Sequence, residues 1–305
     1  MSDQSQTDSP FSGKVIAILL AVALVSFGAI MVLAGWAPEL RDRNVAGTHP
    51  FSTSALGYNG FVQLLEDQGY PVEISRLERT LEDDQWGLLV ITLPSWGAPK
   101  ELEALSPERT TLLVLPKWTG MADPLNKTHQ RDTRFMTASR LNDLLETMEI
   151  DAEIGRIDVP GRIATPFGPM ALKPDVKMQV LRGASLTPIV ETEDGILLAW
   201  APDAGMYVLS DPDMINTFGL SRIENARFSV QMMDLLRTDR AEPIIFDATL
   251  HGFVRSENLL QMVFDVPFLG ATLTALVAAG LLGWAAVIRF GPPMQEGRAI
   301  AFGKL

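Results

Sequence analysis

The side chains best suited to chemistry are three aspartates and a histidine within one stretch of the chain. Asp211 and Asp213 follow one short apolar run, and Asp247 and His251 follow the next. Carboxylates and an imidazole suit Mg, Mn or Zn, so these residues could form a metal or phosphate site. The alternative is structural, because aspartates also shape turns and cap helices, and a loop histidine can simply hydrogen-bond. We favour this alternative and assign no metal ligands.

The elements around these residues follow a strand–helix–strand pattern. Met206–Leu209 is apolar and stops before aspartate and proline, which is typical of a strand that runs into a turn. Ser221 and Glu224 have the spacing of a capping box, which predicts a helix that begins at Ser221, with Asn225 in its first turn. Pro243–Phe246 is short, apolar and rich in isoleucine, as a buried strand would be. We therefore predict a βαβ unit whose strands both end in polar loops.

Polar segments follow four predicted strands, whose last apolar residues are Leu93, Leu115, Leu209 and Phe246. If these strands are parallel neighbours, the segments emerge at one edge of the sheet, where open α/β sheets bind ligands. The segments are Pro94–Trp96, Lys117–Trp118, Asp211–Asp213 and Asp247–His251. The helix from Ser221 would point its amino end, with partial positive charge, at the same edge.

We predict that a local function lies on this edge. The candidate ligand- or partner-binding residues are Asp211, Asp213, Asn225, Asp247, His251 and Lys117. An edge of this kind could hold an anion, a metal or a peptide of a partner. The acidic composition favours a cation or a basic segment of a partner. We predict no cofactor, because the chain has no glycine-rich phosphate loop.

Composition excludes several kinds of chemistry. The 305 residues include no cysteine, which excludes disulfides, zinc–thiolate sites and thiol catalysis. Ser95 follows a strand in LPSWG, but the leading glycine of a nucleophile elbow is missing, so we interpret it as a turn residue. His49 and His129 lie in polar segments without metal-ligand spacing. The net charge of −12 argues against nucleic acid as a partner.

Two long runs without charged residues have the length of transmembrane helices. They are Val15–Trp36 and Val266–Ile288, and a span needs about 20 residues. The alternative for the first run is a signal peptide cleaved near Ala34–Ala37, but the run is long for an h-region and only Lys14 precedes it. The alternative for the second run is a buried hairpin. We favour two uncleaved spans, which makes the lipid bilayer a partner.

The distribution of charge predicts the orientation. Residues 37–265 hold 34 of the 37 acidic residues and 21 of the 25 basic ones, so their net charge is −13. The tails 1–14 and 289–305 place Lys14 and Arg289 next to the two runs. The positive-inside rule then puts both tails in the cytoplasm and the central domain outside it. We expect a two-pass protein of the inner (plasma) membrane with membrane-protein partners.

The central region has the pattern of an α/β domain. Gly87–Leu93 and Thr110–Leu115 are continuous apolar runs, as expected for parallel strands buried on both faces. Ser54 can cap a helix that Gly69 would end. Residues 151–203 contain short strand-like pieces broken by glycine and proline, which predicts an antiparallel, β-rich insertion. The domain should therefore be a layered sheet covered by helices.

Several motifs together resemble one known family. They are S-A-L-G-Y, L-L-E-D-Q-G-Y, L-L-V-L-P-K-W, L-S-D-P-D-M-I-N, E-N-A-R-F, F-D-A-T-L-H-G-F and R-F-G-P-P. Over nearly the whole chain the combination resembles bacterial two-span membrane proteins with a domain of unknown function similar to class I glutamine amidotransferases. The resemblance implies a flavodoxin-like (amidotransferase-like) domain beside MoxR-type ATPases and von Willebrand factor A domain proteins. It implies no catalytic residue, and family members usually continue further beyond R-F-G-P-P.

Two functions are open at this point. The first is a membrane-anchored, non-catalytic binding or assembly module, because amidotransferase chemistry needs a thiolate that the chain lacks. The alternative is a divergent hydrolase or a ligand sensor that uses the Asp/His loops. A clustered, solvent-reachable site of Asp211, Asp247 and His251 would favour the alternative. Capped or dispersed side chains would favour the module.

Overall fold

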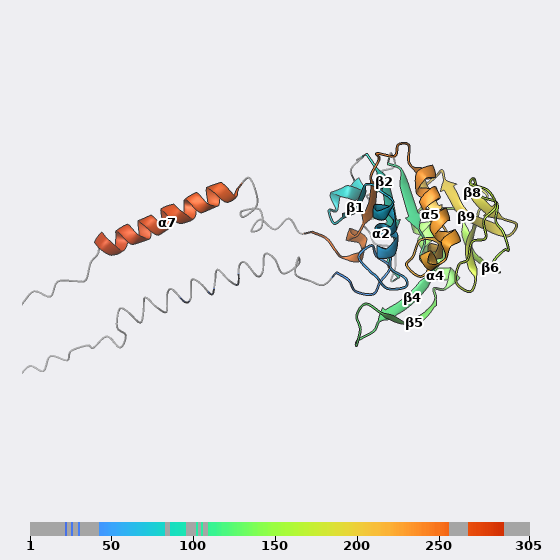
Figure 1. The fold of residues 1–305 in the computed structure, drawn as a ribbon, viewed down its shortest axis with the longest axis horizontal. Helices are drawn as coiled ribbons and strands as arrows, with labels where there is room; N and C mark the ends of the chain where they lie inside the picture. Colours follow the sequence, from blue (N-terminus) through green and yellow to red (C-terminus); the bar gives the residue numbers. More distant parts are fainter. Residues whose placement is uncertain are drawn as a thin grey trace, which may run out of the picture. The chain divides into compact units, whose positions relative to one another are not determined.

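The computed structural model describes residues 43–82, 86–95, 109–255 and 268–289, together with residues 22, 26, 30, 102 and 105. The chain divides into two units. Asp42–Arg255 forms one compact unit, and Met1–Arg41 with Ser256–Leu305 forms the other. The first unit contains the sheet and all six candidate residues, and Figure 1 shows its ribbon.

A nine-stranded sheet runs through the first unit. Its order is β1 (Val72–Ser75), β11 (Ile244–Asp247), β2 (Leu88–Thr92), β3 (Thr111–Val114), β10 (Met206–Leu209), β9 (Gly195–Ala201), β7 (Met178–Arg182) and β6 (Glu153–Ile157), and β8 (Thr187–Thr192) also pairs with β9. The five strands from β1 to β10 are parallel neighbours. The remaining pairings are antiparallel. The structure thus confirms an α/β fold, and the strands β6 to β9, which lie within residues 151–203, pair antiparallel with one another.

Helices cover both faces of the parallel strands. The helices are α2 (Asn59–Asp67), α3 (Arg79–Glu82), α4 (Ala138–Thr147) and α5 (Ile223–Leu236), with short 3-10 helices η2 (Pro212–Met214), η3 (Gly219–Ser221) and η4 (Thr249–His251). Phe61 of α2 and Phe228 of α5 pack on the face that Val90 presents, and Figure 1 shows these two helices on the same side of the sheet. Leu141 of α4 packs on the face of Ile91. Every residue of β2 and β3 is buried, as continuous apolar runs predict.

A separate two-stranded hairpin was not predicted from the sequence. β4 (Trp118–Ala122) and β5 (Gln130–Phe135) pair antiparallel and form a sheet of their own. The hairpin begins directly after Lys117, at the end of the buried part of the sheet. Figure 1 shows it projecting away from the helices and the large sheet.

Two predicted helix starts differ from the structure. Helix α2 begins at Asn59 rather than near Ser54, whose hydroxyl instead lies 2.9 Å from that of Ser52. Helix α5 begins at Ile223 without a side-chain cap, because the Ser221 hydroxyl donates to the Phe218 carbonyl at 2.6 Å. Gly69 does follow the end of α2, with a φ of 82° that favours glycine.

The second unit contains helix α7 (Leu269–Arg289), which covers most of the second uncharged run. Of the first run the structure describes only Val22, Ser26 and Ile30, which are helical and exposed. Among the residues that the structure describes, no helix has both the length and the apolar character needed to cross a bilayer. The two predicted spans are therefore not confirmed here.

Candidate functional site

The four predicted strand ends do meet at one edge of the sheet. Strands β11, β2, β3 and β10 are consecutive parallel neighbours, so their carboxyl ends share that edge. The segments that follow include Pro94–Ser95, Lys117–Trp118, Asp211–Asp213 and Asp247–His251, while Trp96 lies outside the described residues. The predicted segments therefore share one edge of the sheet. What this edge can bind depends on the contacts of each side chain.

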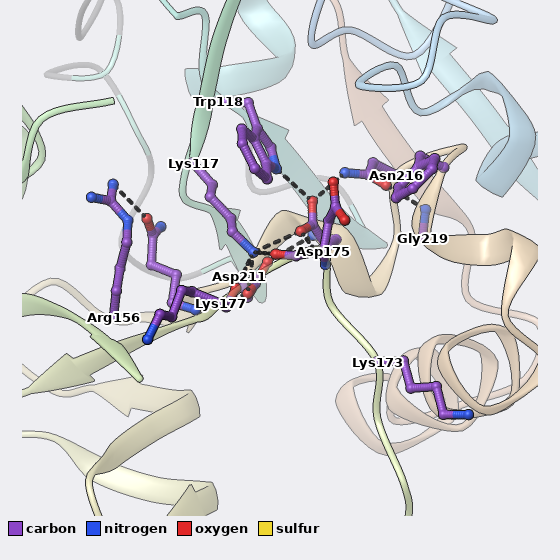
Figure 2. A network of polar contacts seen from close by, with 12 residues as sticks. Lys117, Trp118, Arg156, Lys173, Asp175, Lys177, Asp211, Asn216 and Gly219 are labelled. Carbon is purple, nitrogen blue, oxygen red and sulfur yellow. Dashed lines mark hydrogen bonds and ion pairs between the residues drawn. The ribbon is translucent and has the colours of Figure 1, made fainter. Parts of the chain in front are cut away.

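A buried lysine is the centre of one cluster at this edge. The Lys117 ammonium group donates to Asp211 Oδ2 at 2.9 Å and to Asp213 Oδ2 at 2.6 Å. It also lies 2.6 Å from the carbonyl oxygen of Lys177 and 3.3 Å from that of Asp175. All three charged side chains are fully buried or nearly so. Figure 2 shows the ammonium group pointing into these oxygens.

The two carboxylates of this Lys117 cluster are saturated by donors. Asp213 Oδ1 accepts from the Trp118 indole nitrogen at 2.8 Å and from the Asn216 amide at 2.7 Å. Asp211 Oδ1 accepts from the Asp213 backbone N–H at 3.0 Å and so caps η2. Asp211 Oδ2 accepts from the Gln179 N–H at 2.8 Å. Each carboxylate oxygen therefore has a protein donor, which is the structural interpretation favoured from the sequence.

Burial dominates the electrostatics of the cluster. It raises the pKa of Asp211 to about 6, and the charge of Asp213 raises it further while Lys117 opposes both. The Tyr58 phenol is buried beside the same carboxylates, and burial and their negative charge raise its pKa as well. One ammonium group faces two carboxylates, so the cluster is acidic overall. It holds a proton more readily than isolated aspartates would.

Asn225 belongs to the same cluster but faces the backbone. From the first turn of α5, its amide donates to the carbonyl oxygens of Lys173 at 3.0 Å, Gly219 at 3.2 Å and Asp213 at 3.3 Å. Its carbonyl oxygen accepts from the Lys173 N–H at 2.8 Å. The side chain thus fixes the segment before β7 to η2 and η3.

Asp247 and His251 form separate contacts. Asp247 accepts from the Thr249 hydroxyl at 2.7 Å and from the Leu250 N–H at 3.0 Å, which closes the turn after β11. His251 Nε2 lies 2.8 Å from the carbonyl oxygen of Thr92, at the end of β2. Burial lowers the pKa of His251 to about 3 and raises the pKa of Asp247. Both side chains therefore have structural partners.

Strand spacing divides the six candidates into two groups. β2 and β3 lie between β11 and β10. Three spacings of about 4.8 Å separate the end of β11 from the end of β10 by about 14 Å. Asp211, Asp213, Lys117 and Asn225 are joined by hydrogen bonds, whereas Asp247 and His251 bond to their own neighbours. The edge does not bring all six side chains around one point.

A segment of the chain itself covers this edge. Residues 46–58, which we call the edge segment, contact the loops that follow β2 and β10. Thr48 donates to the Leu93 carbonyl at 3.0 Å, the Thr217 N–H donates to Gly57, and the Phe218 N–H donates to Ala55. The cavity left between the edge segment and Lys117 measures about 10 Å³. That volume holds about one water molecule.

The same unit has two other hollows, one beside the edge segment and one between α4 and β6. A pocket of about 170 Å³ opens beside the edge segment, between Trp118, Phe218 and Asp175. It is smaller than the ~300–1,000 Å³ of most ligand pockets. A hollow of about 500 Å³ is lined by acidic residues between α4 and β6 and contains none of the six candidates. Within the described ranges, no group of three or more His, Asp or Glu side chains could hold a metal ion.

His49 was missed by sequence reasoning. It comes from the edge segment, and its ring lies 5.7 Å from that of His251 and 4.7 Å from that of Phe253. Burial lowers its pKa to about 4. Its Nδ1 has no hydrogen-bond partner among the described residues. The polar sequence around His49 does not predict its contact with His251, because the two histidines lie near opposite ends of the unit in the sequence.

The fold and the site define an α/β domain in which the strand ends are occupied by an internal charge cluster and by the edge segment. No protein-family model matches the chain, and no curated protein matches it either.

Proposed function

We propose that the chain is a membrane-anchored, non-catalytic binding or assembly module. The proposal rests on the burial and the hydrogen bonds of the candidate residues. Asp211, Asp213 and Lys117 are buried and bonded to one another, and Asp247 bonds to its own turn. A catalytic carboxylate or base must reach the proton or ligand on which it acts. Side chains with saturated oxygens under a covering segment favour a structural role.

The two ends of the compact unit meet, which supports two anchors. The edge segment and the last described residues of the unit pack together through His49 with His251 and through Phe51 with Phe253. The Arg76 guanidinium also donates to the Phe253 carbonyl at 3.0 Å. A domain whose ends lie side by side suits a chain that leaves a bilayer and returns to the same bilayer. We propose two spans, with the domain outside the cytoplasm and both tails inside.

Five parallel strands between two helical layers support the finer proposal of a flavodoxin-like, amidotransferase-like domain. Such enzymes place a nucleophile at the carboxyl edge of the sheet, and this chain has no cysteine to place there. The proposal of partners among MoxR-type ATPases and von Willebrand factor A domain proteins rests on the resemblance of the motifs alone.

Fusions to alkaline phosphatase test the anchoring. A fusion after Asp203 should be active, because it would lie outside the cytoplasm, and a fusion after Leu305 should be inactive. Carbonate extraction should leave the chain in the membrane pellet. The reverse fusion pattern, or release by carbonate, would refute the topology. A mature chain that starts near Ala37 would remove the first span alone.

Purification of the full chain in detergent tests the assembly. Tagged wild-type chain should enrich the same membrane-associated or ATPase partners in independent preparations, with mass spectrometry as the readout. Asp247→Asn should leave that set unchanged if its carboxylate only closes a turn. Reproducible hydrolase activity that Asp247→Asn or His251→Gln abolishes, in folded protein, would instead establish the alternative of a divergent hydrolase.

A further inference from the structure

A small pocket opens at the carboxyl edge of the sheet, beside the Lys117 cluster. Its volume is about 170 Å³, and Trp118 and Asp213 are among its lining residues. Trp118 comes shortly after β3 and Asp213 shortly after β10, which are neighbouring parallel strands. Open α/β sheets bind their ligands outside such strand ends. The pocket holds roughly five water molecules, which is about the room of one long side chain.

Much of the pocket wall is apolar. Ala55 and Leu56 come from the edge segment, and Phe218 comes from the loop between η2 and η3. The Phe218 N–H donates to the Ala55 carbonyl at 3.0 Å, so the backbone is fixed while 38% of the residue stays exposed. The Arg222 guanidinium already lies 4.4 Å from the centre of the Phe218 ring. A ring that accepts one guanidinium in this way can pack against a second basic side chain through its remaining surface.

A strained turn holds Asp175 beside the pocket. Val176 has a φ of 59°, which is rare for a β-branched residue, and the Lys177 N–H donates to the Asp175 carbonyl at 2.7 Å. These features indicate a γ-turn of the rare, strained form. The Lys117 ammonium group binds the carbonyl oxygens at both ends of this turn, and the Asp175 N–H donates to Asp213 Oδ2. Strain of this kind persists where the surroundings enforce it, and it is enriched at functional sites.

The carboxylate of Asp175 is not used by the described part of the chain, where it makes no hydrogen bond or ion pair. Its basic neighbours in the sequence are Lys173 and Lys177. The Lys177 ammonium group donates to Asp158 at 2.6 Å, and Figure 2 shows Lys173 pointing away from the Lys117 cluster. Asp175 is half-buried and lines the pocket, so its carboxylate can meet a cationic group that enters there.

We propose that this pocket receives an arginine side chain of a partner protein, with the guanidinium at Asp175 and the methylene stem along Leu56 and Phe218. The inference rests on the proposed function and adds the chemistry of the partner. An arginine fits better than a lysine because its planar head can donate two hydrogen bonds to one carboxylate and can stack on a ring. Residues 37–265 carry a net charge of −13, which attracts a basic segment to the domain.

A short peptide tests the pocket before the partner is known. The full-length chain in a non-ionic detergent carries 5-fluorotryptophan at its six tryptophans, and Trp118→Phe identifies the fluorine resonance of Trp118. The blocked tripeptide acetyl-Gly-Arg-Gly-amide should shift this resonance in a saturable manner. Its citrulline analogue has nearly the same shape without the charge and should bind at least about fivefold more weakly. Equal affinities for the two peptides, or no shift with either, would overturn the proposal.

Two substitutions in the pocket have a matched control. Asp175→Asn keeps the backbone groups that hold the turn and should weaken binding of the arginine peptide at least about fivefold. Ala55→Leu adds bulk to an exposed residue of the pocket wall and should block binding. The control Asp203→Asn removes an exposed aspartate between β9 and β10, at the amino end of β10, and should bind as wild type does. Equal losses in Asp175→Asn and Asp203→Asn would show a general attraction to acidic surface and would overturn the site.

Free arginine distinguishes a partner's side chain from a small ligand. In the proposed complex only the side chain enters the pocket, so the tripeptide should bind at least as tightly as free arginine in the same fluorine titration. Tighter binding of free arginine would identify a site for a small molecule and would overturn the assignment of a protein partner.

Co-purification separates this inference from the proposed function. A wild-type chain that enriches no reproducible partner would refute the binding module itself. Where the wild-type chain does enrich a partner, Asp175→Asn and Ala55→Leu should lose it and Asp203→Asn should retain it. Equal recovery of the partner by all three variants would overturn only the role of the pocket.

Discussion

Acid should destabilise the domain through the two histidines that join its ends. His49 and His251 have pKa values lowered by burial to about 4 and about 3, against 6.5 in an unfolded chain, and each lies where the other's charge would be unfavourable. Below pH 6.5 the unfolded chain binds protons that the folded chain does not. Folding stability is therefore fully present above pH 6.5 and falls as the pH drops towards the folded pKa values.

The size of the effect follows from the two pKa differences. Between pH 7 and pH 5 each histidine should remove about 2 kcal/mol from the free energy of unfolding, or about 4 kcal/mol for the pair. Urea unfolding of the detergent-solubilised chain, followed by tryptophan fluorescence at several pH values, measures this loss.

His49→Phe isolates one half of the effect. Phenylalanine keeps the packing on Phe253 and replaces the ring whose Nδ1 has no hydrogen-bond partner in the described part of the chain. The variant should lose about 2 kcal/mol less than wild type between pH 7 and pH 5. Exposed His129→Gln serves as the control and should leave the pH dependence unchanged. An unchanged pH dependence in His49→Phe would show that this ring does not titrate on unfolding and would refute the reasoning.

Three further predictions concern the Lys117 cluster. The pKa of Asp211 is about 6 in the folded chain, against 3.8 in an unfolded chain. Its protonation should therefore add about 1 kcal/mol to the free energy of unfolding between pH 7 and pH 5, and this gain is lost as the pH rises through 6. Asp211→Asn should remove the gain from the same urea measurements. Lys117→Met should cost about 3–5 kcal/mol of unfolding free energy because it leaves two buried carboxylates without their ion pair. The control Lys177→Met breaks an exposed pair with Asp158 and should cost under about 1 kcal/mol. Equal losses in the two variants would contradict the role of burial. Gly219→Ala would place a Cβ 1.7 Å from the Asp213 carbonyl oxygen and should cost at least about 1–3 kcal/mol, while Gly161→Ala, which meets no atom within 4 Å, should unfold at nearly the same urea concentration as wild type.

The parallel strands were predictable because their signal is local. β2 and β3 lie in continuous apolar runs that are followed by prolines. A strand that is buried on both faces has this pattern, because its side chains are apolar on both sides. The shared edge followed from the parallel order of the strands. The start of α5 was predicted wrongly because the hydroxyl of Ser221 bonds within η3 and not to the helix that follows. A capping-box spacing does not specify which backbone group the hydroxyl will find.

The contacts within the site were not predictable from spacing. Lys117 and Asp211 are 94 residues apart, and Thr92 and His251 are 159 residues apart. Whether a carboxylate at a strand end binds a ligand or a lysine of the same chain depends on what the insertion and the edge segment bring there. The hairpin was not predicted for a related reason: β5 carries mostly polar, exposed residues, and no residue of β4 or β5 is fully buried.

We interpret the Lys117 cluster as a group that fixes the positions of neighbouring segments rather than one that adds stability. A buried ion pair seldom stabilises a fold more than well-packed apolar side chains of similar size would. Here one ammonium group binds the segment before β7 and the turn after β10, while Asp213 binds the indole of Trp118 at the base of the hairpin. Apolar side chains could fill this volume, but they would not fix the direction of the indole. The cluster therefore fixes the base of the hairpin through this indole, and that role requires a defined position but no reaction.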